Sequence, residues 1–499
     1  MPSYELRKTP SAKELSDLQM YPHFLQTLLT SRGILTSHNA EKFFDPQYER
    51  DLHDPFLLLG MNKAVERILQ AIEQKEKIVI YSDYDADGIP GGAMLRSFFD
   101  SIGYENVENY IPHRHDEGFG LHEGAVASLA DKGAHLIITI DCGIADVVAG
   151  LVAKEKGVDL IITDHHESGD ELPHAYAIID HKQPGCTYPE QVLCGSGVAY
   201  KLVQGILAKN RFGLKEGYEK WLLDLVGIAT LSDMVPLTGE NRALAHFGLR
   251  VLRKSPRYGL QEMWKKLRIN QRYIVEDDIG FSFSPRINAA SRMGHPMDAF
   301  ALLSAKSMQD AVIAAEVLEG LNAERKTLVA QTVKELKKAL REKEAAGPLP
   351  KVIVLGNPNW KPALLGLVAN NLLDEVRRPI FLWGRNGDGT IKGSCRSDGS
   401  ASLISIMEHA KGSFVQFGGH KMAGGFAVYS ESIHRLEEAL NTAYEAVKES
   451  DSEGAVIHLD AELALSDIHW KTYDMIQKLA PFGVGNPKPL FLIRQAEIQ

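Results

Sequence analysis

Three short apolar runs, each followed at once by acidic residues, constrain the fold of this chain more than any other feature. Short apolar runs separated by helical patterns are typical of buried parallel strands. Ligands bind outside the carboxyl ends of the strands in open parallel sheets, so acids placed there are expected to meet at one edge. We therefore predict an α/β fold with a doubly wound, mostly parallel sheet. The runs are residues 77–81, 135–140 and 158–163, and the first acids after them are Asp83, Asp141 and Asp164.

The order of helical and strand patterns predicts several domains, because a chain of 499 residues is too long for one hydrophobic core. A long helical tract near residues 308–346 is expected to join the doubly wound domain to a second α/β domain. The last segment alternates apolar and polar residues, which predicts β structure. The expected boundaries are a helical lead-in at 1–60, the catalytic domain at 61–250, a helical connector at 251–346, the second domain at 347–447 and the β segment at 455–499.

Composition excludes some classes of protein. No run approaches the roughly 18 to 20 apolar residues of a membrane span, and the N-terminus lacks the apolar core of a signal peptide. Four scattered cysteines without CxxC spacing favour free thiols in a reducing compartment, so we expect a cytoplasmic protein. The net charge of −10 excludes a surface that is basic all over, but it permits a local basic groove for nucleic acid.

The first acidic motif favours a metal site. Asp83, Asp85 and Asp87 alternate at spacing two, so in a strand-like exit they would share one side. Carboxylate oxygens suit Mg²⁺ or Mn²⁺. A calcium hand would need a glutamate at the twelfth position and flanking helices, which this segment lacks.

The second and third motifs add one aspartate and a histidine pair. Asp141 alone is as well explained by helix capping as by metal ligation. His165 and His166 follow Asp164 and cannot both face one way, so one is expected to bind metal while the other points toward the substrate. Two bridged metal ions would activate water for an in-line phosphoryl displacement. The three motifs together indicate a metal-dependent phosphoesterase.

These motifs resemble those of the DHH phosphoesterase superfamily, and within it the RecJ-type exonucleases. The resemblance covers nearly the whole chain. The superfamily motifs are residues 83–88, 141–143, 164–166 and 229–237, and the RecJ-type segments are 51–56, 111–121, 285–292, 393–397, 418–421 and 481–487.

The resemblance implies a set of site residues and a cofactor, Mn²⁺ or Mg²⁺, as two ions. His166 is expected to face the scissile phosphate beside Asp164, and Asp83 either binds metal or orients its neighbours. Asp224 rivals Asp233 as the fourth-motif ligand, and Asp233 is favoured because it follows an apolar run as the other acids do. The implied metal ligands are Asp85, Asp87, Asp141, His165 and Asp233.

The second α/β domain resembles the DHHA1 substrate-binding domain. Its Gly-rich backbone at 418–425 could approach a phosphate closely. The final β segment resembles an OB-fold that is cut short at Gln499. The residues expected to bind substrate are Ser394, Arg396, His420 and Lys421 in the second domain, with Arg114, Arg286 and Arg292 on the facing side.

The function implied by the resemblance is metal-dependent 5′→3′ hydrolysis of single-stranded DNA in repair and recombination. A monomer is expected, with a single-strand-binding protein and a helicase as candidate partners and no membrane association. One alternative is a phosphodiesterase of short oligonucleotides or cyclic dinucleotides, which a substrate length series would reveal. The other is a non-catalytic DNA-binding scaffold, whose function would survive Asp141→Ala.

Overall fold

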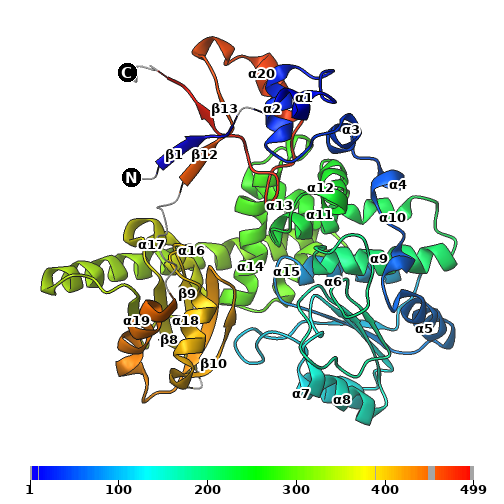
Figure 1. The fold of residues 1–499 in the computed structure, drawn as a ribbon. Coiled ribbons are helices and arrows are strands. Elements are labelled where there is room, and N and C mark those ends of the chain that lie inside the picture. The colour runs from blue at the N-terminus through cyan, green and yellow to red at the C-terminus, as the bar shows by residue number, and fades with distance from the viewer. Residues whose placement is uncertain (1–2, 9, 388, 448–455, 495–499) are drawn as a thin grey trace. The chain divides into compact units, whose positions relative to one another are not determined.

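The computed structural model describes residues 3–8, 10–387, 389–447 and 456–494, and these residues form two compact units (Figure 1). The large unit comprises Tyr4–Gly320 and Ile457–Gln499, and the small unit comprises Leu321–Val456. The division falls within helix α16 (Met308–Ala346), the long connecting helix that the sequence predicts. Within the described ranges, no helix is both long and apolar enough to cross a membrane.

The large unit is built on a five-stranded sheet in the order β3-β2-β4-β5-β6. Every neighbouring pair in it is parallel, which confirms the predicted architecture. The central strands form because their apolar side chains are buried on both faces, and β2 and β4 expose no residue. The strands are β2 (Ile78–Ser82), β3 (Val107–Tyr110), β4 (Leu136–Ile140), β5 (Asp159–Thr163) and β6 (Ala177–Ile179).

Helices cover both faces of this sheet (Figure 1). One face packs against α6 and α9, and α5 contacts both α9 and strand β6. The other face packs against α7 and α8 through an apolar cluster that includes Val79, Ile137 and Ile162. The helices are α5 (Met61–Gln74), α6 (Gly88–Ser101), α7 (Glu123–Asp131), α8 (Val147–Lys156) and α9 (Gly195–Lys209).

The strand register brings the acidic residues to one level. Ser82 pairs with Ile140, Ile140 with Thr163, and Thr163 with Ile179, so the next residue of each strand begins the same edge. The chain runs outward from β2 to β3 and then returns to β4 on the other side of β2. This reversal is the topological switch point at which doubly wound sheets bind ligands.

The apolar stretch at 221–231 is helical and does not end as a strand. Helix α11 (Leu223–Ser232) is buried at every position from Leu223 to Thr230. A helix enclosed on all sides has no polar face, so its sequence shows the same continuous apolar run as a buried strand. The strand-end argument for Asp233 was therefore wrong, although Asp233 does follow this element as its C-cap.

The remaining elements of the large unit are helical except at the chain's two ends. Strands β1 and β12 pair there, as do β13 and β14. The helices are α1 (Ala12–Leu15), α2 (His23–Thr30), α3 (Ser37–Phe44), α4 (Tyr48–Asp51), α10 (Tyr218–Trp221), α12 (Gly239–Leu252), α13 (Tyr258–Leu267), η3 (Asp278–Phe283, a π-helix), α14 (Ser284–Met293), α15 (Met297–Leu303) and α20 (Trp470–Gln477), and the strands are β1 (Ser3–Leu6), β12 (Val456–Leu459), β13 (Ala461–Glu462) and β14 (Phe491–Leu492).

The small unit is a second α/β fold around a mixed five-stranded sheet in the order β10-β11-β9-β8-β7. Only the β7–β8 pair is parallel among these strands. Leu336 and Leu340 of α16 pack into its core beside Trp360. Its other elements are β7 (Ile353–Gly356), α17 (Pro362–Val376), β8 (Ile380–Arg385), β9 (Ile391–Arg396), α18 (Leu403–His409), β10 (Phe414–Gly419), β11 (Ala423–Val428) and α19 (Leu436–Val447).

Candidate metal centre

The first acidic motif lies on a tight turn between β2 and α6. The expected strand-like exit is wrong because β2 ends at Ser82 and α6 begins at Gly88, but all three aspartates do occur in the candidate metal groups of one cluster. Asp85 Oδ1 accepts hydrogen bonds from the backbone N–H of Asp87 at 2.7 Å and of Gly88 at 3.2 Å. A Cβ at Gly88 would lie 2.5 Å from the carbonyl oxygen of Asp83, so only glycine permits this turn.

Asp87 is fixed by the beginning of helix α9. Its Oδ2 accepts from the N–H of Gly195 at 2.6 Å, and its Oδ1 accepts from the N–H of Ser196 at 2.7 Å. The positive end of a helix dipole favours a carboxylate at this position. Even so, burial raises the pKa of Asp87 and outweighs the lowering effects of His165 and these hydrogen bonds.

Asp141 follows β4 in a left-handed backbone conformation, with φ of +64°. It does not cap a helix, because α8 begins at Val147 and its N-cap is Asp146. The helix-capping explanation of Asp141 is therefore wrong. A Cβ at Gly195 would lie 2.5 Å from the Cβ of Asp141, so the close approach of α9 requires glycine there.

His165 lies among three carboxylates. Its Nε2 is 3.0 Å from Asp141 Oδ1 and 3.9 Å from Asp87 Oδ2, and its Nδ1 is 3.8 Å from Asp233 Oδ2. Burial lowers the pKa of His165 despite these acids. A neutral imidazole is the form that binds a metal ion.

His166 contacts a different carboxylate from its neighbour. Its Nδ1 is 2.7 Å from Asp164 Oδ1, and its side chain is 42% exposed. Burial opposes the charged imidazole, but the hydrogen bond with Asp164 prevails and raises the pKa of His166 to about 9. Asp164 also accepts the N–H groups of Ile144 and His165, so it orients both the loop after β4 and the histidine pair.

The structure separates the two candidates for the fourth motif. Asp233 lies near His165, as described above. Asp224 is buried elsewhere, where its Oδ2 accepts from Ser255 Oγ at 2.6 Å and from Arg257 Nε at 2.9 Å. Asp224 therefore has a structural ion pair and lies in no candidate metal group among the described residues.

Three groups of side chains could each surround a cation with ligand atoms within 4.8 Å of one another: Asp83, Asp85 and Asp141; Asp87, His165 and Asp233; and Asp141, His165 and His166. The third group has Asp141 in common with the first and His165 in common with the second, so two ions could lie side by side. All five predicted ligands occur in these groups, together with Asp83 and His166.

The acidic residues of this cluster fit a divalent cation. The buried Oδ1 atoms of Asp83 and Asp141 accept no hydrogen bond from any described residue. Burial and then the neighbouring carboxylates raise the pKa of both groups well above the usual value. Buried carboxylates that repel one another are unfavourable unless a cation compensates them.

The predicted arginines of the large unit have different surroundings. Arg114 lies over the ring of Tyr84 at 4.7 Å, next to the acidic turn, and both Arg114 and Arg292 act electrostatically on Tyr84. Arg286 donates to the carbonyl of Ser282 and forms an ion pair with Glu319. Arg114 is thus the predicted arginine most directly linked to the cluster.

In the small unit, the predicted residues lie on the central strand β9 and on the turn between β10 and β11. Ser394 and Arg396 alternate on β9 and pair with Gly425 and Ala423 of β11. The Arg396 guanidinium packs on α17, where a Cβ at Gly366 would lie 2.8 Å from Nη2. His420 and Lys421 lie with Met422 in the turn between β10 and β11, and β11 then begins at Ala423, which pairs with Arg396.

Three residues near the cluster were missed. Asn288 Oδ1 accepts the N–H of Ala86 at 2.9 Å and so holds the acidic turn from α14, a contact too distant in sequence to predict. Asp180 follows β6 in register with the other strand-end aspartates, and burial raises its pKa to about 7. The sequence signal that could have identified Asp180 is an acid directly after a short apolar run, as in the other motifs. Phe119 is 53% exposed, and its ring lies 5.3 Å from that of His166.

Comparison with known protein families agrees with this arrangement. The DHH family, N-terminal domain, matches residues 77–230, the DHHA1 domain matches 349–449 and the RecJ OB domain matches 459–499. The single-stranded-DNA-specific exonuclease RecJ of Dickeya dadantii is 32% identical over 98% of this chain and 86% of its own length. This chain belongs to the RecJ family.

Other RecJ proteins extend the comparison. RecJ of Bacillus subtilis is 36% identical over 98% of this chain, which spans only 60% of that relative. The crystal structure of Thermus thermophilus RecJ with Mn²⁺ matches with a TM-score of 0.83 and 27% identity, covering 98% of this chain and 69% of that one. The Thermus protein has also been solved with Mg²⁺, and that structure matches with a TM-score of 0.76. The fold and the metals of RecJ thus accord with the cluster described above.

Proposed function

We propose that this chain is a metal-dependent exonuclease that hydrolyses single-stranded DNA from its 5′ end. The observation that carries the proposal is the acidic cluster at the carboxyl edge of the parallel sheet, where two buried carboxylate oxygens accept no hydrogen bond from any described residue. The RecJ relatives are single-stranded-DNA-specific exonucleases, which supports the same substrate for this chain.

Within this proposal, Asp83, Asp85 and Asp141 hold one cation, and Asp87, His165 and Asp233 hold the other. Asp141 links the two sites, because it belongs to the first group and its Oδ1 lies 3.0 Å from His165 Nε2 of the second. The bound cations supply charge neutralisation and activation of water for phosphodiester hydrolysis.

His166 would bind the scissile phosphate. Asp164 fixes its ring through Nδ1, which leaves Nε2 as the donor toward substrate. Arg114, held over Tyr84, would contact a neighbouring phosphate. The Arg396 side chain and the exposed turn at His420 and Lys421 would anchor the 5′ end. Contacts to phosphate without base readout would make digestion insensitive to sequence.

The wider biological setting is also a proposal. Digestion of single strands suits DNA repair and recombination in the cytoplasm, with a single-strand-binding protein and a helicase as partners of a monomeric enzyme. The proposed chemistry of the acidic cluster does not depend on the single-strand-binding protein or the helicase.

Digestion of a 5′-phosphorylated, 3′-labelled single strand, beside the same strand in a duplex, tests the proposal. We expect loss of the single strand alone with Mn²⁺ or Mg²⁺, and no loss with EDTA. A 5′-labelled strand should release its label as mononucleotide from the first turnovers. Asp131→Asn, which changes an exposed acid on α7, is the matched control for Asp141→Asn.

Other outcomes would replace the proposal. Cleavage confined to dinucleotides through tetranucleotides, or to cyclic dinucleotides, would indicate an oligonucleotide phosphodiesterase. Binding of single strands without turnover in either metal, unchanged in Asp141→Asn, would indicate a scaffold.

A further inference from the structure

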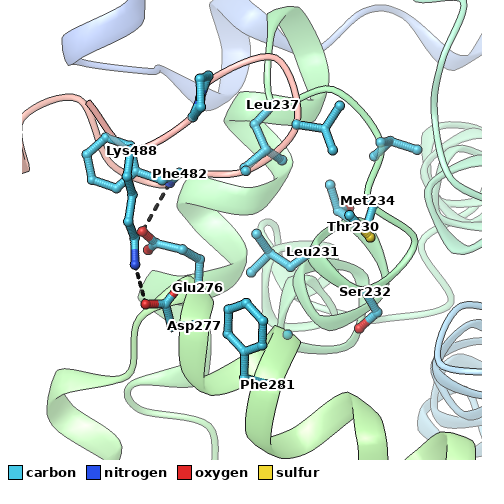
Figure 2. Close-up of a pocket in the computed structure, with 15 residues that line it drawn as sticks. Thr230, Leu231, Ser232, Met234, Leu237, Glu276, Asp277, Phe281, Phe482 and Lys488 are labelled. Carbon is cyan, nitrogen blue, oxygen red and sulfur yellow. Dashed lines mark hydrogen bonds and ion pairs between the residues drawn. The ribbon is translucent and has the colours of Figure 1, made fainter. Parts of the chain in front are cut away.

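An open pocket of about 360 Å³ lies in the large unit (Figure 2). Three segments form it: the end of α11 with the loop after it, the π-helix η3, and the segment at 482–488. Most of its lining is apolar, and Leu231, Leu237 and Phe482 contribute to it.

Two large apolar side chains at this pocket are open to solvent. Phe281 is 80% exposed and Met234 is 67% exposed. A single exposed apolar residue is ordinary, but several that line one hollow mark a binding site. Met234 also has a φ of +60°, a conformation that residues with a Cβ rarely adopt. Such strained residues gather at functional sites.

Two residues that line the pocket are the chain neighbours of the candidate metal ligand Asp233. Met234 directly follows Asp233, and Ser232 lines the pocket one residue before that ligand. Ser232 Oγ is hydrogen-bonded to Ser284 Oγ, which fixes the end of α11 against the start of α14, directly after the π-helix that carries Phe281. The lining of the pocket thus includes both chain neighbours of the candidate metal ligand Asp233.

The charged groups of the pocket already have partners. Glu276 accepts the N–H of Phe482 at 3.1 Å, and Asp277 forms an ion pair with Lys488. Figure 2 shows these charged side chains together on one side, whereas Phe281, Leu231 and Met234 lie toward Ser232. The surface left for a ligand is thus apolar and aromatic.

We propose that this pocket binds a nucleobase of the strand whose phosphate lies on the acidic cluster. Phe281 stacks on the base, and the thioether of Met234 makes a polarizable contact with it. Every base has a flat π face, so such a pocket holds any of the four bases. This inference rests on the proposed function, because it requires a nucleic acid at the metal centre.

A double-mutant cycle, with one change in the protein and one in the DNA strand, tests whether the pocket binds a base. One change is Phe281→Ala, and the other is an abasic site placed in turn at each of the first four nucleotides of a single strand. We expect Phe281→Ala to raise KM roughly tenfold with little change in kcat, as loss of one stacked base does. One abasic position should raise KM equally in the wild type and should have no further effect in Phe281→Ala.

Two variants control for structure. Phe281→Trp keeps an aromatic face and should restore KM. Tyr273→Ala removes a side chain of similar exposure, 75%, outside this pocket and should leave KM unchanged. Unfolding curves should be the same for all the variants, because both side chains are exposed.

Independent effects of the two changes, or an unchanged KM in Phe281→Ala, would overturn the proposal. Fluorescence anisotropy of the same strands, in the presence of Ca²⁺, measures binding without requiring turnover. If the wild type does not digest single strands, the proposed function fails. The anisotropy cycle then still decides whether Phe281 contacts a base.

Discussion

The two sheets of this protein differ in the charge and in the burial of the candidate site residues that they carry. The parallel sheet of the large unit ends in carboxylates that are buried and fixed by backbone N–H groups, as Asp87 is by Gly195 and Ser196. The mixed sheet of the small unit presents His420 and Lys421 on an exposed hairpin turn, with only Arg396 partly buried. One set is rigid and desolvated, and the other is mostly solvated.

The difference in burial indicates which role the acidic residues and the basic residues can each have. Buried acids that repel one another require a cation, so their geometry determines chemistry. Exposed cations are screened by salt and contribute to affinity for a polyanion with little geometric demand. Changes in the first sheet should therefore reduce kcat and metal binding, and changes in the second should raise KM.

The largest effect is expected from Asp141→Asn. The change removes a carboxylate that belongs to one metal group and lies 3.0 Å from His165 of the other, so kcat should fall on the order of 10³-fold. The metal-free variant should unfold at a higher temperature than the wild type, because one repelling buried charge is gone. Exonuclease assays and melting curves in EDTA measure the two effects. A wild-type kcat in this variant would contradict the assignment of the chemistry to the acidic sheet.

A paired substitution sharpens the assignment within the acidic sheet. Asp233→Asn should reduce kcat about 100-fold, whereas Asp224→Asn should leave kcat unchanged. Asp224→Asn breaks the buried ion pair with Arg257 and should cost about 3 kcal/mol of unfolding free energy. Steady-state kinetics and urea denaturation separate these outcomes. The reverse pattern would make Asp224 the ligand.

A smaller effect is expected from Asn288→Ala. This variant frees the N–H of Ala86 and loosens the acidic turn without removing any carboxylate. Groups that hold metal ligands in place are typically worth about 10- to 100-fold in affinity or activity. We expect a loss in that range, partly recovered at high Mn²⁺. An activity that no Mn²⁺ concentration improves would mean that Asn288 acts on substrate instead.

The smallest effect concerns the other sheet. Gly366→Ala would place a methyl group 2.8 Å from Arg396 Nη2 and displace the guanidinium. The KM for a 5′-phosphorylated strand should rise about fivefold, the equivalent of roughly 1 kcal/mol of binding. Both kcat and Mn²⁺ affinity should stay as in the wild type. A drop in Mn²⁺ affinity would show that the two sheets do not divide binding and chemistry as proposed.

The sequence predicts the acidic sheet well because its signals are local. Each apolar run ends beside its own acid, and the register of parallel strands then brings Asp83, Asp141 and Asp164 to one level. The sequence fails where local signals are ambiguous. A helix buried on all sides, α11, has the same continuous apolar pattern as a strand.

Long-range contacts account for the other failures. Asn288 and Ala86 meet only because α14 packs near the acidic turn, and no spacing rule links residues so far apart. The surroundings of single arginines were also beyond prediction, since Arg286 is paired with Glu319 whereas Arg114 lies over an aromatic ring.

Isothermal titration of the metal-free protein with Mn²⁺ tests the central claim most directly. The account predicts two ions bound per wild-type chain and the loss of both as tight sites in Asp141→Asn, because Asp141 belongs to one group and its Oδ1 lies 3.0 Å from His165 Nε2 of the other. Wild-type binding in Asp141→Asn, or no binding in either protein, would contradict a metal centre at the ends of these strands.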